Sequence, residues 1–193
     1  AYSFTLYDGA CNPMPQYALY PGEFTYKYPV AGKPVAKVSL HSYDVETRKT
    51  KKIDLPGSQI EYIPRIEYAY SADRLIVTTL NRAQNRMEMF TVNPKSTVCK
   101  SLLVEQCDAW LSPLAYQNAT MLPDGVVIFS DRSGFMHLYK YSYSGALLKT
   151  ITSGEFDVDS FYGCDAKGNY YFRANNTGTV NRTISVSYTH LRA

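Results

Sequence analysis

Two of the three histidines lie near serines in segments where polar and apolar residues alternate, and a serine-histidine pair is what nucleophilic catalysis requires. His41 precedes Ser42, and His137 follows Ser133 by four residues, so either histidine could be drawn into a Ser-His-Asp set. The sequence has no G-x-S-x-G, H-E-x-x-H, Walker-type or G-x-G-x-x-G motif to present a nucleophile, a metal or a phosphate. We therefore expect both histidines to lie on the surface of a sheet, and we predict no catalytic residue.

Metal ligands are sparse. Asp157 and Asp159 form a D-x-D pattern that suits a hard cation, but too few oxygen ligands cluster around it, so we favour a solvated loop or a capping hydrogen bond. With three histidines and no C-x-x-C pair, zinc-ligand spacing cannot be built from the four cysteines, Cys11, Cys99, Cys107 and Cys164. We expect buried free thiols, with a Cys99–Cys107 bridge as the alternative. No metal and no cofactor is predicted.

Two further features could belong to a binding or catalytic site, residues 130–134 and Trp110. Residues 130–134, with the sequence S-D-R-S-G, resemble the Asp box of sialidases, but the tryptophan that should follow is absent. A tight polar turn between strands is the better interpretation. Trp110, the single tryptophan, begins a crossing between structural repeats. We expect it to pack along an inner surface, and stacking on a ligand is the alternative.

Composition excludes several classes of protein. The 193 residues are 45% hydrophobic and 19% charged, as in ordinary soluble globular proteins. The net charge is only +3, and the one dense basic cluster, residues 48–52, is typical of a solvated hairpin tip, so no nucleic-acid partner is expected. The longest apolar runs, such as residues 125–129, are far shorter than the roughly 20 residues of a membrane-spanning helix.

Tyrosine dominates the pattern along the chain. The 18 Tyr and 8 Phe alternate with Val, Ile and Thr in short runs, which is typical of half-buried strands, and helical signals are nearly absent. Strands are predicted at residues 35–43, 49–55, 67–70, 74–80, 87–92, 98–104, 126–130, 137–143, 147–152 and 170–173. Turn residues such as Pro123, Asp124 and Gly125 separate them.

The strands form a repeat in which an Asp-containing turn precedes an apolar strand, a polar turn and an aromatic hairpin. Eighteen residues separate Asp73 from Thr91, Asp124 from Ser142, and Asp165 from Thr183. The aspartates lie 51 and then 41 residues apart, near the repeat length of four-stranded propeller blades. We therefore predict an all-β fold, a β-propeller with about three to four blades. Either this is a compact small propeller or an arc of a larger one, and Ala1 in place of Met favours the arc.

The ends of the chain differ from the repeats. Residues 1–28, rich in Pro and Tyr, are predicted to form an extended arm before the blades, because Pro lacks the N–H that a sheet ladder needs. Residues 29–185 hold the partial propeller. Residues 186–193 break the pattern and resemble translated adaptor sequence, so we interpret them as a non-native tail.

Four sequence motifs lie between residues 28 and 158. They are Y-P-V-A-G-K-P-V at residues 28–35, L-N-R-A-Q-N-R at 80–86, D-R-S-G-F-M-H-L-Y at 131–139 and I-T-S-G-E-F-D-V at 151–158. In order and spacing they resemble Y-P-K-A-G-x-x-N, L-N-R-x-Q-N, (D/N)-E-x-G-(F/Y)-x-H-(L/I)-Y and I-T-x-G-x-W-(D/E)-V of the dipeptidyl peptidase IV family of prolyl oligopeptidase-like serine peptidases. Phe156 replaces the family's Trp. The resemblance spans about residues 19–184.

This resemblance implies that the chain is part of the N-terminal eight-bladed propeller of a serine exopeptidase that removes Xaa-Pro or Xaa-Ala dipeptides from peptides. The family's catalytic Ser, Asp and His lie in an α/β-hydrolase domain that would follow this chain. Its Glu-Glu pair, which holds the substrate ammonium, would precede Ala1. A further Phe-Arg contact aligns with Leu114 and Ala115, so it does not carry over. No catalytic, cofactor-binding or metal residue is therefore assigned.

The resemblance also implies the partners of the parent protein: peptide substrates, its own C-terminal hydrolase domain, and a second copy bound through residues 1–28. The propeller would then gate substrate access and pack against the hydrolase domain. Resemblance to bacterial members implies a periplasmic or outer-envelope location. Two other functions remain as alternatives, a non-enzymatic propeller that binds a protein or glycan and a self-contained sialidase-type hydrolase.

Overall fold

The computed structural model describes residues 3–4, 11–16, 22–27, 32–57, 60–178 and 180–188. The chain divides into two compact units, Ala1–Asp54 and Leu55–Ala193, and each has its own sheets. Among the described residues, no helix has the length and apolar character needed to cross a membrane.

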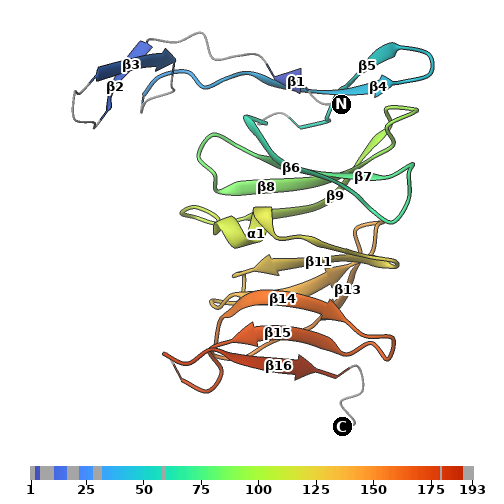
Figure 1. Cartoon of the computed structure of the whole chain (residues 1–193). Helices are drawn as coiled ribbons and strands as arrows, with labels where there is room; N and C mark the ends of the chain where they lie inside the picture. The colour runs from blue at the N-terminus through green and yellow to red at the C-terminus, as the bar shows by residue number, and fades with distance from the viewer. Residues whose placement is uncertain are drawn as a thin grey trace. The chain divides into compact units, whose positions relative to one another are not determined.

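The first unit contains a two-stranded hairpin and a three-stranded sheet (Figure 1). β2 (Cys11–Gln16) pairs antiparallel with β3 (Gly22–Lys27), while β4 (Val38–Asp44) lies between β1 (Ser3–Phe4) and β5 (Lys49–Ile53). β2 includes two prolines, which a strand of a two-stranded sheet tolerates because one of its edges has no ladder to complete. The predicted arm, residues 1–28, thus includes a hairpin in its described part.

The basic cluster lies where β4 turns into β5. Arg48 occupies the turn with φ 55°, and Asp44 Oδ1 accepts hydrogen bonds of 3.0 Å from the N–H groups of Glu46 and Thr47. The three lysines of the cluster are exposed along β5. The predicted hairpin tip is therefore confirmed for Arg48, and the lysines extend it along a solvated strand.

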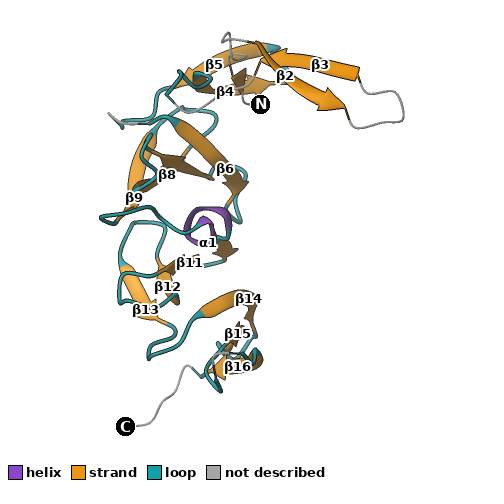
Figure 2. Cartoon of the chain, turned by 90° about the vertical axis from the view of Figure 1, so that its left-hand side faces the viewer, coloured by secondary structure: helices purple, strands orange, loops and turns teal. Residues whose placement is uncertain are grey.

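The second unit contains three antiparallel sheets, each a simple meander (Figure 1). The first sheet consists of β6 (Tyr62–Tyr68), β7 (Leu75–Leu80), β8 (Arg86–Val92) and β9 (Cys99–Gln106). The second consists of β10 (Thr120–Leu122), β11 (Gly125–Ser130), β12 (His137–Tyr141) and β13 (Leu147–Thr150). The third consists of β14 (Val158–Cys164), β15 (Tyr170–Ala174) and β16 (Thr183–Ser187). The short helix α1 (Pro113–Gln117) lies between the first two sheets in sequence and contacts β6 and β11 (Figure 2).

The core of this unit lies between successive sheets, in one apolar cluster at each junction. β11 shows how the two clusters arise, because its side chains alternate between the two faces of its sheet. Val126 and Ile128 belong to the cluster shared with the first sheet, whereas Val127 and Phe129 belong to the cluster shared with the third. All six residues of β11 are buried, as expected for a strand covered on both faces.

Gly125 begins β11 at a very close approach to β12. A Cβ atom at this position would lie 2.1 Å from the carbonyl oxygen of Tyr141. Only glycine fits this turn without moving backbone, which explains the glycine directly after Asp124.

Each of the ten predicted strands overlaps a strand of the structure, and the predicted all-β blade pattern is confirmed. Six strands of the described residues lie outside the predicted ranges: β1, β2, β3, β10, β14 and β16. β10 has only three residues, and the pairing of β14 with β15 shifts register twice, between Val158 and Ser160 and between Phe161 and Gly163. These irregularities disrupt the alternation by which a strand is recognised in sequence.

The eighteen-residue spacing leads to the second strand of the hairpin in each repeat, but it reaches the start of that strand in the third repeat and the far end in the other two. Thr91 lies at the far end of its strand, opposite Ile76, and Ser142 directly follows Tyr141 at the matching end of β12. Thr183 instead begins β16 and pairs with Ala174. The loop between β15 and β16 is longer than its counterparts, so equal spacing there does not mean an equivalent position.

The last strand extends past the predicted end of the propeller region. Val186 pairs with Tyr171 and Ser187 pairs with Tyr170, so the first two residues of the segment 186–193 belong to β16. The rest of that segment from residue 189 onward lies outside the described residues.

Candidate functional site

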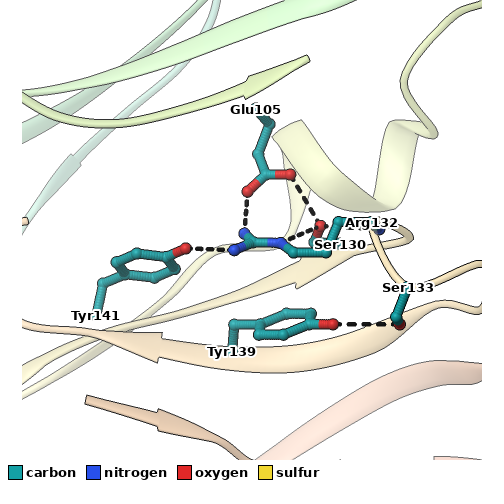
Figure 3. A network of polar contacts seen from close by, with 6 residues as sticks. All are labelled: Glu105, Ser130, Arg132, Ser133, Tyr139 and Tyr141. Atoms are coloured by element: carbon teal, nitrogen blue, oxygen red, sulfur yellow. Dashed lines mark hydrogen bonds and ion pairs between the residues drawn. The ribbon is translucent and has the colours of Figure 1, made fainter. Parts of the chain in front are cut away.

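The densest polar network joins the first sheet to the loop between β11 and β12 (Figure 3). The Arg132 guanidinium donates to Glu105 Oε1, to Ser130 Oγ at 2.9 Å and to the Tyr141 hydroxyl at 2.5 Å. Ser130 Oγ in turn donates to Glu105 Oε2 at 2.8 Å. The guanidinium carbon lies 4.3 Å from the centroid of the Tyr139 ring, so Arg132 is held by an acid, two hydroxyls and two aromatic rings.

Glu105 is the buried charged residue of this network, with 7% of its surface exposed. Burial raises its pKa, while the hydrogen bond from Ser130 and the charge of Arg132 act in the opposite direction. Arg132 therefore compensates a carboxylate that would otherwise be costly to bury. The arrangement can lock two sheets together, but it offers no exposed nucleophile or base.

The predicted polar turn at residues 130–134 is confirmed, since Gly134 N donates to Asp131 O at 2.8 Å and Gly134 has φ +96°. The role of Arg132 was missed. Its ion-pair partner lies 27 residues away on another sheet, and no local pattern connects the two. The corresponding family motif has Glu where this chain has Arg132. The residue that pairs with Glu105 is therefore one at which this chain departs from the family motif.

His137 is buried, with 2% exposure, so its expected place on the surface of a sheet is wrong. Its Nδ1 lies 3.1 Å from Thr152 Oγ1, and its Nε2 lies 3.0 Å from the carbonyl oxygen of Gly154. Since a carbonyl only accepts, Nε2 carries the donated proton. Phe156 packs edge-on against the imidazole at 5.2 Å. Both ring nitrogens are used, which leaves His137 a structural residue.

His41 lies in the first unit, with Nε2 3.0 Å from Ser39 Oγ. In the described part of the chain no carboxylate contacts this imidazole, so the group that would orient a catalytic histidine is missing there.

The two acids of the D-x-D pattern have separate partners. Asp157 Oδ1 accepts a hydrogen bond from Met136 N at 2.8 Å, whereas Asp159 forms ion pairs with Arg173 at 2.7 Å and Arg182 at 2.9 Å. Within the described ranges, no group of three or more His, Cys, Asp or Glu is arranged to hold a metal ion. The capping hydrogen bond favoured from sequence is present at Asp157.

The positions that align with the family's Phe-Arg contact lie on helix α1. Ser112 caps its N-terminus, accepting from Leu114 N at 3.3 Å, and Ala115 is 1% exposed. At the other end, Arg65 donates to the carbonyl of Gln117 and pairs with Glu67 at 2.6 Å. α1 thus offers neither an aromatic ring nor a guanidinium at these positions.

Trp110 is 73% exposed, so the expectation that it packs is wrong. It lies in the loop between β9 and α1.

No disulfide joins the described cysteines, and the Cys99 thiol donates to the carbonyl oxygen of Thr97 at 3.4 Å. Cys99 and Cys107 are half-buried and Cys164 is exposed, so the alternative of a Cys99–Cys107 bridge is wrong and the thiols are less buried than expected. The side chain of Cys11 lies outside the described residues.

Comparisons with known proteins agree with this fold. The family model of the dipeptidyl peptidase IV (DPP IV) N-terminal region matches residues 9–191. The chain belongs to this family. The matched range contains all four motifs, which lie between Tyr28 and Val158, and the match confirms the resemblance inferred from them.

Solved and curated relatives of the DPP IV N-terminal region agree. The crystal structure of Porphyromonas gingivalis dipeptidyl peptidase 4 superimposes with a TM-score of 0.86 at 37% identity, covering 95% of this chain and 26% of that one. "Probable dipeptidyl peptidase 4" of Emericella nidulans is 27% identical over 88% of this chain and 24% of its own length. "Dipeptidyl peptidase 4" of Trichophyton rubrum is 24% identical over 88% and 23%. The chain spans about a quarter of the length of these relatives.

Proposed function

We propose that this chain is the non-catalytic propeller portion of a serine exopeptidase that removes Xaa-Pro or Xaa-Ala dipeptides from the N-termini of peptides. The observation that carries the proposal is the similarity of 95% of the chain to Porphyromonas gingivalis dipeptidyl peptidase 4, at 37% identity. The activity for which that protein is named supplies the reaction class, and the family resemblance supplies the dipeptide preference.

In this proposal the sheets form part of a rigid wall. Contacts between sheets support the rigidity: Arg132 with Glu105 across the first junction, and Asp157 with Met136 across the second. A wall of this kind limits which peptides reach the reaction chamber. It also packs on an α/β-hydrolase domain, so that the nucleophile and the anchor for the substrate's amino group keep a fixed separation.

The reaction is tested on the product of the complete reading frame. We expect it to release dye from a Gly-Pro-dye substrate, and a Ser→Ala change at the serine of a G-x-S-x-G motif outside this chain to abolish the release. An intact frame that lacks the hydrolase domain and shows no activity would overturn the proposal in favour of a binding propeller.

Gating requires a different measurement, because a wall affects large substrates more than small ones. We compare dipeptide removal from a short peptide and from a folded protein that carries the same N-terminal residues. Asp157→Ala should increase the relative rate for the folded protein, whereas Asp157→Asn retains an acceptor for Met136 N–H and should stay near wild type. Equal ratios in all three proteins would show that the wall does not gate.

We propose in addition that the parent protein forms a homodimer through residues 1–28. The β2–β3 hairpin, a two-stranded sheet within this segment, supports the proposal because its strand edges can pair with a second copy. Light scattering of the full-length protein should give a dimer, and a variant lacking residues 1–28 should be monomeric. A dimer that persists in the shortened variant would place the interface elsewhere.

A further inference from the structure

A groove of about 390 Å³ opens between the first and second sheets, at the opposite end of the strands from the Arg132 loop. Its walls come from the β6–β7 turn, the β8–β9 turn with the start of β9, and the β12–β13 turn. The residues that matter for its chemistry are Arg74, Asn93, Lys100, Ser101, Tyr143 and Ser144. None of them belongs to the motifs or contacts used in the proposed function.

Arg74 is fixed in this groove without a carboxylate partner. Its guanidinium carbon lies 4.6 Å from the centroid of the Tyr143 ring, and the Tyr143 hydroxyl is anchored by donating to Leu122 O at 2.6 Å. In the described part of the chain, neither Arg74 nor Lys100 has an acid within ion-pair distance. Asp73, the acid in the lining, is paired with Lys95 at 3.4 Å. The groove therefore holds two cations with open capacity for an anion.

Tyr70 adds an exposed aromatic ring next to this site. It is 69% exposed and has φ 44°, a left-handed backbone that non-glycine residues rarely adopt. The turn is held by hydrogen bonds from Ala69 N to Arg74 O at 3.0 Å and from Arg74 N to Ser71 O at 3.2 Å. Tyr70 belongs to the same β6–β7 turn as Arg74, which lines the groove and contacts the Tyr143 ring. Strained exposed residues of this kind are typical of binding sites.

The remaining polar groups complete the lining. Asn93 Oδ1 already accepts from Lys95 N and Ser96 N, both at 2.9 Å, so its amide NH₂ is the part left to donate. Ser101 Oγ donates to Glu88 Oε1 at 2.8 Å, so its lone pairs remain as acceptors. Such mixed donors and acceptors suit the hydroxyl groups of a sugar better than a bare phosphate.

We propose that this groove binds an acidic sugar, a uronic acid residue of an oligosaccharide. Its carboxylate lies on Arg74 and Lys100, the C–H face of its pyranose ring stacks on Tyr70, and its hydroxyls bond to Asn93, Ser101 and Ser144. The site is independent of peptidase activity, because it uses none of the residues of the proposed function.

The test is titration of the full-length protein with D-galacturonic acid, followed by NMR or calorimetry, with D-galactose and N-acetylglutamate as probes of the ring and of the carboxylate alone. We expect saturable binding of galacturonate that is tighter than either probe and about tenfold weaker in Arg74→Gln, as for loss of a charge-assisted pair. Arg74→Lys should recover part of the affinity, and Tyr70→Ala should lower it several-fold.

Lys167→Gln is the matched control, since Lys167 lies in the β14–β15 turn of a different sheet and does not line the groove. It should leave binding unchanged. The proposal is overturned by absence of binding, by equal binding of galactose or N-acetylglutamate, or by an unchanged affinity in Arg74→Gln. Peptidase activity is assayed in parallel, and we expect it to be the same in every groove variant, so failure of one proposal is distinguishable from failure of the other.

Discussion

The carboxylate of Asp157 accepts a hydrogen bond at 2.8 Å from the backbone N–H of Met136, and Val158 N donates to Met136 O at 2.8 Å. One residue of the β11–β12 loop is thus bound on both its polar groups by the start of the third sheet. In addition, Asp157 N donates to Asn175 Oδ1 at 2.7 Å. The junction between the second and third sheets therefore depends on backbone groups as well as on apolar packing.

Replacing Asp157 by Ala should lower the free energy of unfolding by ~1 kcal/mol, because the Met136 N–H then loses its acceptor. Asp157→Asn keeps a side-chain oxygen and should lose less than half as much. Urea unfolding of the three proteins, followed by circular dichroism, measures the differences. Equal stability of the Ala variant and the wild type would show that water replaces this contact without cost.

His137→Phe should be destabilising by ~2–3 kcal/mol although it keeps a buried aromatic ring. The substitution leaves the carbonyl of Gly154 without the Nε2 donor and Thr152 Oγ1 without Nδ1. Thermal unfolding measures the loss. His137→Gln, which can supply a donor and an acceptor, should be closer to wild type, and the reverse ranking of the two variants would contradict the assigned role.

Arg132→Met should cost ~3–5 kcal/mol, because it leaves the Glu105 carboxylate buried and unpaired. The double variant Glu105→Gln with Arg132→Met should be more stable than Arg132→Met alone. A double-mutant cycle based on urea unfolding gives the coupling between the two residues. Additive effects would indicate that the pair does not interact in solution.

The same variant has a pH signature. Burial already raises the pKa of Glu105, and removal of Arg132 takes away a charge that opposes the rise. A carboxyl whose pKa is raised in the folded state makes the protein less stable as the pH increases through that raised pKa. Arg132→Met should therefore be closer in stability to the wild type at about pH 4, near the ordinary carboxyl pKa, than at about pH 8. Unfolding at the two pH values checks this, and a pH-independent difference would argue against it.

Asp124 provides a pH dependence of the opposite sign. The hydrogen bond from Lys140 at 2.6 Å lowers the pKa of Asp124, so its contribution is present above the unfolded pKa of about 3.9 and is lost as the pH falls through the folded value. Because Asp124 is largely exposed, the contribution is at most about 1 kcal/mol. The stability difference between wild type and Asp124→Asn should shrink below about pH 4. A difference that persists at pH 2 would mean that charge is not its cause.

Much of the fold follows from local pattern. Short apolar and aromatic runs identify β7, β8, β11 and β12, and the Asp-containing turns at Asp73 and Asp124 precede β7 and β11. Where the ladder is regular, sequence period and structure agree. Where β14 bulges against β15 the strand was not recognised, and where the loop before Thr183 is longer the same spacing reaches the start of the strand and not its end.

The side-chain environments were decided by which loops the stacked sheets bring together. Sequence alone identified the four motifs and hence the family, because those residues are contiguous. It did not show that Trp110 is exposed, that His137 is buried, or that Arg132 finds Glu105 on another sheet. Burial and ion pairing depend on neighbours that lie far away along the chain. The type of a residue and the local pattern around it do not identify those neighbours, because they come together only when the sheets pack.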